Sequence, residues 1–416
     1  MKVLMILPSL PYPPDSGGKV RMFNLIKNLS DEHKISLLCY MGLGDDAQYI
    51  PYLLKYCEDV RVVHRRSIRS IQNFFLAMFS KYPFLVVMRG FSHSTEKKIL
   101  EIVRMKKPDL IHVETFYVSQ PILKIKNHFK IPLLLAKHNI ESLVYERYFR
   151  TRKNLFLRLL GYLDTYKMKK YEIEVCKHFD SFTLVSENDL RTFKKLIPGL
   201  NSNSYVIPNG VDLSYFDGKV DHSIENKQPT LLFVGTFAFV GNIDALLYFY
   251  RYSFPIVQRK IPNVKLYIVG SRPPKRIERL SSDSVVVTGY VEDLREYLTM
   301  CDVFIVPLRA GSGTRLKILE AMAMRKPVVS TSIGTEGIGA VPGRDAIIAD
   351  TPEEFAEEVV KLLKNKKLRA RIGSNGKRLV ETKYNWEPIA KKLSQVYQET
   401  VEKFALKRKK ERVRVK

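Results

Sequence analysis

A glycine-rich loop near residue 311, followed by a predicted helix, combines free backbone N–H groups with a helix N-terminus, and both favour a bound diphosphate. The apolar run 303–306 predicts a buried strand, and a helix is predicted to begin near Thr314. Gly311 and Gly313 leave backbone N–H groups open to an anion, and the helix N-terminus adds the positive end of its dipole. Glycine loops of this kind also occur in α/β domains that bind no phosphate, so the loop alone does not decide the matter.

Charged side chains around this loop suit the rest of a nucleotide. Arg309, Arg315 and Lys317 add positive charge beside the loop. Glu320 lies inside the helix, where its carboxylate can accept two hydroxyl hydrogen bonds at once, as a ribose diol requires. The alternative is that Lys317 is a solvated residue on a helix face. Together, the loop and the helix predict a site for a nucleotide diphosphate.

Length and composition indicate two domains in a reducing compartment. The chain has 416 residues, of which 45% are hydrophobic, and this is enough for two cores. Its four cysteines are widely spaced, which favours neither a disulfide framework nor a zinc site. The apolar start runs into prolines and predicts a strand rather than a signal peptide. The most apolar segment, 74–88, is interrupted by Lys81 and Pro83 and is shorter than the ~20 residues that span a bilayer. We therefore expect a cytoplasmic protein.

The charge distribution suggests an anionic partner surface. The net charge is +26, and most of it lies in the N-terminal half and in the C-terminal tail. Residues 147–162 mix basic and large apolar side chains, as does a helix that lies on an anionic membrane. No recognised nucleic-acid-binding module accompanies the charge, which disfavours nucleic acid as a partner. We expect peripheral contact with the inner face of the plasma membrane.

Strand-like runs alternate with helical stretches along the whole chain. They lie at 3–7, 35–40, 60–64, 110–113, 133–136 and 181–185, then at 231–234, 265–269, 285–288, 303–306 and 327–330. This alternation predicts βαβ units and parallel sheets. A turn at residues 208–210 separates two Rossmann-like domains, 1–207 and 208–384. The remainder, 385–416, is predicted to form a helix from about Trp386 to Leu406 and then a disordered basic tail.

Seven short motifs, in order along the chain, carry a resemblance to a known family. They are Asp15-Ser-Gly17-Gly18, Lys-His138-Asn139, Pro-Asn209-Gly210-Val-Asp212, Val-Gly235-Thr236, Val-Gly270, Thr288-Gly289 and Lys317-Ile-Leu-Glu320. With them the chain resembles a family 4 glycosyltransferase of the GT-B architecture over nearly its whole length. The runs 242–245 and 319–324 are most similar to sugar transferases of bacterial surface-polysaccharide pathways.

The resemblance implies an α/β fold in which two Rossmann-like domains face each other across a cleft and the last helix crosses back to the first domain. The second domain would bind the nucleotide-sugar donor, and the first a glycan or lipid-linked acceptor. The implied catalytic residues are His138, facing the donor sugar, with Lys317 and Arg309 on the diphosphate. The implied donor-binding residues are Gly17, Gly18, Gly235, Thr236, Ser312, Gly313, Thr314, Arg315, Leu316 and Glu320.

Two departures from the family pattern affect the expected donor site. Ser312 stands where relatives usually have a second glutamate that touches the sugar, so the identity of the sugar is open. The region after Gly235 has no cation where relatives have an Arg and a Lys, and Arg309 and Lys317 are expected to supply that charge. His138 could instead be a local hydrogen-bonding residue, as histidines at strand ends often are.

The implied activity is retaining sugar transfer from a nucleotide-diphosphate donor, with no metal and no cofactor. The chain has neither an Asp-x-Asp motif nor a cluster of residues at metal-ligand spacing. Two alternatives stay open. One is a nucleotide-sugar epimerase of the same fold. The other is a membrane-associated binding protein without turnover, which the serine at position 312 makes conceivable.

Overall fold

A computed structural model describes residues 1–42, 47–64, 71–90, 95–150, 154–197, 203–217, 228–310 and 314–414. The chain forms two compact units. Unit 1 contains Met1–Pro208 and Trp386–Lys416, and unit 2 contains Asn209–Asn385. Both boundaries lie one residue beyond those expected from the sequence.

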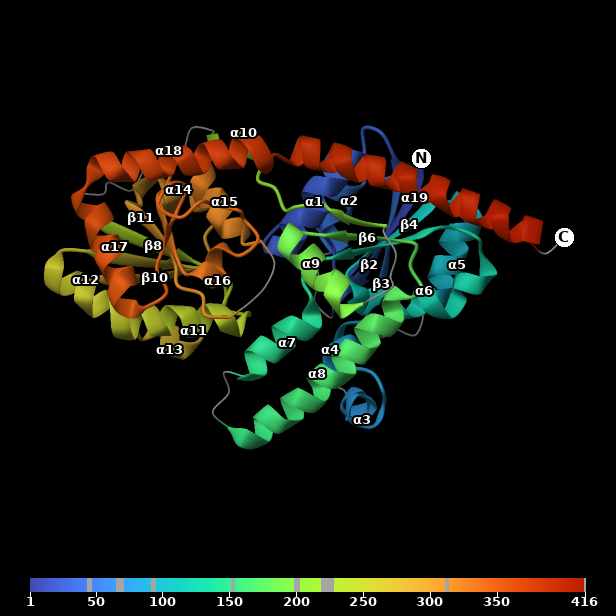
Figure 1. The fold of residues 1–416 in the computed structure, drawn as a ribbon, viewed down its shortest axis with the longest axis horizontal. Coiled ribbons are helices and arrows are strands. Elements are labelled where there is room, and N and C mark those ends of the chain that lie inside the picture. Colours follow the sequence, from blue (N-terminus) through green and yellow to red (C-terminus); the bar gives the residue numbers. More distant parts are fainter. Residues whose placement is uncertain are drawn as a thin grey trace. The chain divides into compact units, whose positions relative to one another are not determined.

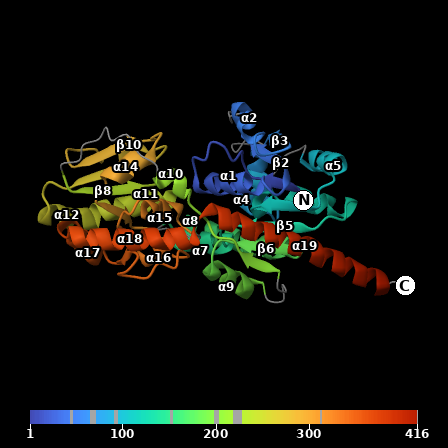
Figure 2. The ribbon, with the colours of Figure 1, turned by 90° about the horizontal axis from the view of Figure 1, so that it is seen from above.

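Unit 1 is built on a parallel sheet in which the described strands have the order β3-β2-β1-β4-β5-β6-β7. The strands are β1 (Lys2–Leu7), β2 (Lys34–Met41), β3 (Asp59–His64), β4 (Leu110–Glu114), β5 (Leu133–Lys137), β6 (Ser181–Leu184) and β7 (Ser204–Val206). In Figure 2, β3 and β2 lie toward one edge of this sheet, and β6 lies toward the other. The strand order reverses between β1 and β4, which is where open α/β sheets bind ligands.

Unit 2 has a second parallel sheet, with the order β10-β9-β8-β11-β12-β13. Its strands are β8 (Thr230–Val234), β9 (Lys265–Val269), β10 (Val285–Gly289), β11 (Val303–Val306), β12 (Val328–Ser330) and β13 (Ile347–Ile348). The order reverses between β8 and β11. All strands expected from the sequence are present. The short edge strands β7 and β13 were not predicted, because the apolar runs that overlap them, 205–207 and 346–349, are brief.

Helices cover both faces of each sheet, so the strands are near-continuous apolar runs. Those of unit 1 are α1 (Gly17–Leu29), α2 (Ile50–Leu53), α3 (Ile71–Phe79), α4 (Phe84–Gly90), α5 (Thr95–Lys106), α6 (Gln120–Ile125), α7 (Glu141–Arg150), α8 (Leu155–Cys176), α9 (Glu187–Leu196) and α19 (Trp386–Arg414). Those of unit 2 are α10 (Leu213–Asp217), α11 (Val240–Tyr248), α12 (Phe254–Lys260), α13 (Lys275–Glu278), α14 (Leu294–Met300), α15 (Leu316–Ala323), α16 (Ser332–Thr335), α17 (Pro352–Lys364) and α18 (Lys366–Lys383). None of the described helices is long and apolar enough to cross a bilayer.

The last helix, α19, belongs to unit 1 and packs beside α1 (Figure 1). It buries an apolar face that includes Leu393, Val396 and Tyr397. The prediction that the tail is disordered from Lys407 is wrong, because the helix continues to Arg414. Lysine and arginine are good helix formers, so a basic composition does not by itself end a helix.

Candidate active site

Lys317 lies at the point where the strand order of unit 2 reverses. It stands in the first turn of α15, and its Nζ donates to the Val234 carbonyl at the end of β8 (2.6 Å) and to Asn242 Oδ1 on α11 (3.0 Å). Both acceptors are neutral, and among the described residues no carboxylate forms an ion pair with this ammonium group. Burial, together with the nearby Arg315, lowers the pKa of Lys317 to about 7, although the nearby Glu320 opposes this shift. A bound anion would supply the missing countercharge.

At the end of β8, the backbone of Gly235 lies very close to that of Gly270 at the end of β9. A Cβ on Gly270 would overlap the carbonyl of Gly235, so the ends of β9 and β8 can meet only with glycine at position 270. A Cβ on Gly235 would lie 2.8 Å from the side-chain amide of Asn242, which in turn donates to the Thr236 carbonyl (2.8 Å). The structure thus brings Gly235 and Thr236 to Lys317 through Asn242. No donor-site role was predicted for Asn242 from the sequence.

Glu320 lies one turn along α15 from Lys317, and burial raises the pKa of its carboxyl group to about 7. Leu316 is the first residue of the helix, and the carbonyl of the buried Thr314 accepts a bond from Asn209 (3.3 Å). These residues therefore share one helix start. Ser312 and Gly313, which the sequence analysis also assigned to the donor site, lie outside the described residues.

Arg309 differs from Lys317 because its charge is already matched. Its guanidinium group forms two bonds to Asp244, at 2.7 and 3.0 Å, and lies 4.1 Å from the centre of the Tyr248 ring. A diphosphate would have to compete with this carboxylate. Of the two cations expected to replace the missing family residues, Lys317 is the better placed.

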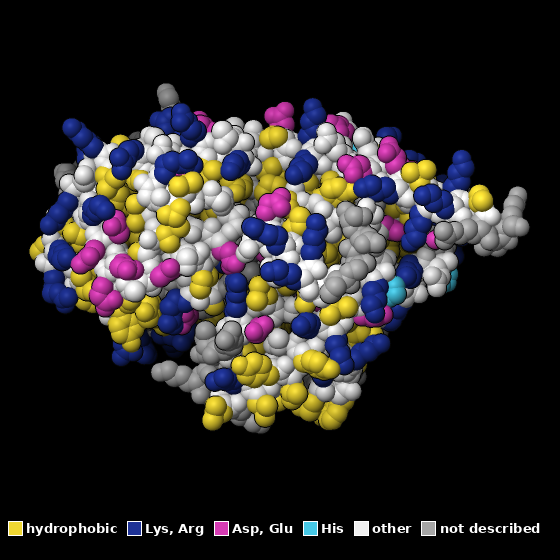
Figure 3. Space-filling model, in the orientation of Figure 1, with side chains coloured by type: hydrophobic (Ala, Val, Ile, Leu, Met, Phe, Trp, Pro, Cys, Tyr) yellow, Lys and Arg dark blue, Asp and Glu magenta, His cyan; other side chains and the backbone are white. Residues whose placement is uncertain are grey.

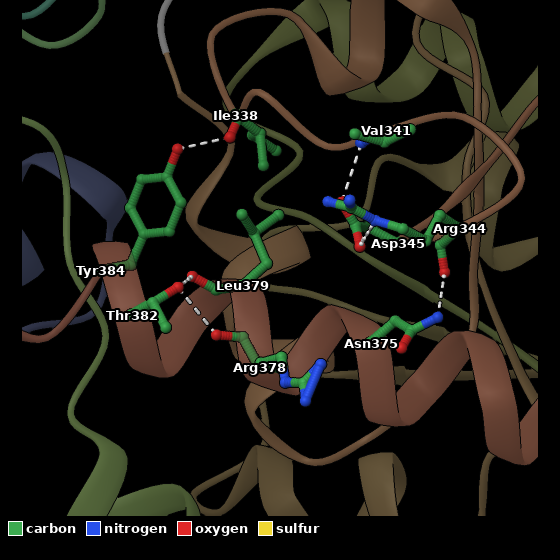
Figure 4. A network of polar contacts seen from close by, with 9 residues as sticks. All are labelled: Ile338, Val341, Arg344, Asp345, Asn375, Arg378, Leu379, Thr382 and Tyr384. Carbon is green, nitrogen blue, oxygen red and sulfur yellow. Dashed lines mark hydrogen bonds and ion pairs between the residues drawn. The ribbon is translucent and has the colours of Figure 1, made fainter.

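Polar contacts connect α18 to the residues at the start of α15. Arg315 Nη2 reaches the carbonyl of Ile333 in α16 (3.5 Å), and the loop that follows α16 is held by polar contacts (Figure 4). Tyr384 donates to the Ile338 carbonyl (2.5 Å), and Asn375 donates to the Arg344 carbonyl (3.0 Å). These bonds connect α18 and the residue after it, through the loop and α16, to the start of α15.

In unit 1 the strand-order reversal brings together three residues of the predicted site. His138 follows β5, and its Nε2 lies 2.5 Å from Oε1 of Glu114 at the end of β4. Gly17 and Gly18 are the first two residues of α1, and a Cβ on Gly18 would lie 3.9 Å from His138 Nδ1. The N-terminus of α1, with its backbone N–H groups, therefore lies next to the Nδ1 edge of the His138 ring.

Glu114 is completely buried and was missed in the sequence analysis. His112 Nε2 lies 2.6 Å from its second oxygen, and Arg21 Nε lies 3.7 Å from the first. Burial alone would raise the pKa of Glu114, but the contacts with His138 and His112 outweigh it and hold the pKa well below its usual value. The available signal was the pattern Leu110–Glu114, an otherwise apolar strand that contains a histidine and ends in a glutamate.

Both halves of the chain match glycosyltransferase families. Residues 16–215 match Glycosyltransferase Family 4, and residues 228–365 match the glycosyl transferases of group 1. The two matches together span most of the chain, and they agree with two parallel sheets whose candidate ligand residues lie at the strand-order reversals. The chain belongs to the glycosyltransferases of family 4, with a group 1 C-terminal domain.

Relatives in sequence cover either nearly the whole chain or about half of it. A 44.6 kDa protein of the cps region of Klebsiella pneumoniae is 24% identical over 398 residues, which are 93% of this chain and 97% of that protein. The capsular polysaccharide biosynthesis glycosyltransferase CapM of Staphylococcus aureus is 27% identical over 230 residues, or 51% of this chain and 58% of CapM. The name of CapM connects that protein with capsular polysaccharide biosynthesis.

Solved structures confirm the GT-B fold. Sucrose-phosphate synthase of Thermosynechococcus elongatus aligns with a TM-score of 0.74 at 18% identity, over 96% of this chain and 98% of the synthase. Anabaena HepE in complex with UDP-glucose aligns with a TM-score of 0.67 at 14% identity, over 95% of this chain and 99% of HepE. At these identities the likeness concerns the fold.

Proposed function

We propose that this protein transfers a sugar, with retention of anomeric configuration, from a nucleoside-diphosphate donor to a growing surface polysaccharide. The observation that carries the proposal is the arrangement at the end of β8. There the Lys317 ammonium group faces neutral oxygens, and the Glu320 carboxylate lies one helix turn away. This spacing suits a diphosphate and the ribose attached to it.

Two kinds of similarity support the choice of donor and acceptor. HepE was solved with UDP and with UDP-glucose, which makes uridine nucleotides the first donors to test. CapM and the cps-region protein suggest a capsule-type acceptor. We assign the donor site to unit 2, and His138 in unit 1 to a hydroxyl of the donor sugar.

Positively charged protein groups beside the leaving diphosphate support a mechanism without a metal ion or cofactor. Lys317 and the start of α15 supply that charge, and positioned cations can stabilise such a leaving group by several kcal/mol. Within the parts of the chain that the structure describes, no three histidine, cysteine, aspartate or glutamate side chains are grouped to hold a metal ion.

A surface formed by α3 and α8, which we call the apolar ridge, is assigned to the inner face of the plasma membrane. Its exposed side chains are Phe75, Met78, Phe79, Leu155, Leu159, Leu160, Tyr162, Leu163 and Tyr166. Hydrophobic side chains gather over these helices in the space-filling view (Figure 3). Lys167 fixes the two helices together by donating to the carbonyls of Ala77 (3.0 Å) and Met78 (3.1 Å).

Basic side chains accompany the apolar ridge. The Arg158 guanidinium group lies 5.7 Å from the Tyr162 ring centre, and Lys170 Nζ lies 4.5 Å from that of Tyr166. Aromatic and aliphatic groups beside cations are typical of surfaces that enter an anionic interface. This surface overlaps the segment 147–162 that the sequence analysis singled out.

The donor is tested by thermal shift with UDP, GDP, ADP and their sugar conjugates, because a ligand at 100 times its Kd adds about 2.7 kcal/mol of stability. The stabilising donor is then incubated with and without membrane extract. Nucleotide release that depends on the extract supports transfer. Conversion of the donor without any acceptor would instead identify an epimerase, and tight donor binding with no turnover over a broad acceptor panel would identify a binding protein.

The membrane assignment is tested by sedimentation with vesicles of phosphatidylglycerol or phosphatidylcholine at two salt concentrations. Binding should favour the anionic vesicles and fall with salt. Leu159→Glu and Leu163→Glu should abolish it, whereas Leu54→Glu, a matched change of an exposed leucine after α2, should not. Equal binding of all variants would remove the apolar ridge from the interface.

A further inference from the structure

We propose that Glu114 is a positioning residue that fixes the orientation and tautomer of His138, and that α19 braces Glu114 through Tyr397 and His112. The inference rests on the proposed function only in assigning His138 to the donor sugar. The bracing itself is a property of unit 1.

The first step concerns which histidine nitrogens carry hydrogen. Glu114 is ionised, since His138 and His112 hold its pKa well below the usual value, and an ionised carboxylate only accepts hydrogen bonds. His138 Nε2, whose hydrogen bond to Glu114 is 2.5 Å long, must therefore present its N–H group to the carboxylate. His112 Nε2 lies 2.6 Å from the other carboxylate oxygen as a close polar contact that does not have hydrogen-bond geometry. With Nε2 of His138 held in this way, its Nδ1 edge faces the start of α1 at Gly18.

The second step connects this pair to the last helix. Tyr397 is completely buried on α19, and its hydroxyl lies 2.5 Å from His112 Nδ1. Burial, with the nearby charge of Glu114, raises the pKa of Tyr397 far above its usual value. The hydroxyl group therefore stays protonated and can donate a hydrogen bond to His112 Nδ1. His112 then carries its hydrogen on Nε2, the nitrogen that faces Glu114.

The third step is that the surroundings leave Glu114 little freedom. Arg21, also buried, donates through Nη1 to the Pro208 carbonyl (2.7 Å) and keeps its Nε 3.7 Å from the carboxylate. The next residue, Thr115, has a φ of +72°, a strained conformation for a residue with a side chain. This strain marks the end of β4 as a place where the surrounding structure maintains an unfavourable backbone geometry.

The experiment compares three variants of the full chain. Glu114→Gln replaces the double acceptor with a group that accepts on one side and donates on the other. Tyr397→Phe removes only the brace. Thr400→Val is the matched control, because it removes another buried α19 hydroxyl, bonded to Ser181 in β6 (2.8 Å) and away from Glu114.

The first readout needs no substrate. Nitrogen-15 NMR of labelled histidine reports which ring nitrogen carries hydrogen, and His138→Gln and His112→Leu assign the two signals among the eight histidines. We expect Nε2–H at both positions in the wild type and in Thr400→Val. In Glu114→Gln, at least one of the two should move its hydrogen to Nδ1. If both stay Nε2–H in Glu114→Gln, the inference is overturned.

The second readout is turnover of the donor that gives the largest thermal shift. Glu114→Gln should lower kcat by about 100-fold and Tyr397→Phe by about tenfold, with nucleotide Kd unchanged, as for other carboxylate–histidine pairs. Equal kcat in Tyr397→Phe and Thr400→Val would overturn the role of α19. Should Glu114→Gln not fold, His112→Gln, which can still donate to Glu114 and accept from Tyr397, must retain activity that His112→Leu loses. If the wild type turns over no donor, the proposed function fails, but the histidine spectra still decide this inference.

Discussion

The buried charged residues at the two strand-order reversals differ in whether the fold supplies a partner of opposite charge. In unit 1 the buried Glu114 is surrounded by His112, His138 and Arg21, so the fold itself matches its charge. In unit 2 the hydrogen bonds that Lys317 donates within the described part of the chain end on neutral oxygens, of Val234 and Asn242. The pKa of the unit 1 carboxylate is lowered because its charged form is favoured, whereas the pKa of Lys317 is lowered to about 7 because burial disfavours its charged form.

This difference indicates a division of labour. The unit 1 groups are fixed before any ligand arrives, and such preorganisation suits groups that must act on a reacting sugar. In the proposed donor site, the unit 2 ammonium group would gain a strong countercharge when an anion binds, and this would suit a site that takes up and releases a nucleotide in each cycle. The following predictions test the comparison, from the largest expected effect to the smallest.

Removing the unit 1 carboxylate should cost the most. Glu114→Ala leaves Arg21 and two histidines buried around a missing charge, and breaking such a cluster typically costs about 3–5 kcal/mol of unfolding free energy. Urea denaturation measures this loss. The control Thr400→Val should cost about 1 kcal/mol. If Glu114→Ala lost no more unfolding free energy than the control, the charge of Glu114 would not be compensated by the surrounding Arg21, His112 and His138.

The two unit 2 cations should behave differently. Lys317→Met should weaken nucleoside-diphosphate binding by about 1.5–3 kcal/mol, the range for hydrogen bonds to charged groups, while binding of the bare nucleoside stays the same. Arg309→Met should have a smaller effect, because Asp244 already pairs with that arginine. Isothermal titration of both ligands checks this. The reverse ranking would make Arg309 the diphosphate residue.

Gly270→Ala should disturb the proposed donor site by displacing the backbone at the end of β8. The added methyl group overlaps the Gly235 carbonyl, so the end of β8 must move and carry the Val234 carbonyl away from Lys317. Overpacking of this kind costs ~1–3 kcal/mol of stability. Nucleotide affinity should fall together with the melting temperature, and unchanged values of both would show that the strand ends can separate freely.

Nucleoside-diphosphate affinity should be greatest near pH 7. Lys317 has a pKa of about 7, so above pH 7 it loses the charge that the diphosphate needs, and affinity falls by at most about tenfold per pH unit. Glu320 also has a pKa of about 7, so below pH 7 it gains a proton and loses acceptor capacity for the ribose. Titrations from pH 5.5 to 8.5 should show both limbs. Lys317→Met should remove the alkaline limb and Glu320→Gln the acidic one, and a flat profile would contradict the assignment.

Local sequence patterns predicted most strands and the two parallel sheets, while the GT-B architecture was predicted from the family resemblance. Apolar runs such as 110–113 and 303–306, separated by glycine and proline turns, are set by neighbours in sequence, and so were predictable. β7 and β13 are edge strands of two or three residues, and the apolar runs around them are too short to distinguish a strand from a loop. The tail helix was missed because its basic composition suggested disorder, although α19 as a whole docks on unit 1.

Contacts between distant residues were not predictable in this way. Lys317 and Glu320 could be recognised because one helix turn carries both. Arg309 meets Asp244 from 65 positions away, and Tyr397 meets His112 from 285 positions away. Such pairs depend on which strands become neighbours, and a single sequence contains no signal for that register. The signs of the charges were visible, but not their partners.

The most direct test of the division of labour is a comparison of His138→Ala with Glu320→Ala in nucleotide binding and in sugar transfer. We expect His138→Ala to bind the nucleoside diphosphate like the wild type and to lose transfer. Glu320→Ala should lose both, with binding weakened by about 1.5–3 kcal/mol for each hydrogen bond to the carboxylate. Melting curves confirm that both variants fold. Nucleotide affinity that depends on His138, or that is unchanged in Glu320→Ala, would contradict the assignment of the donor to unit 2.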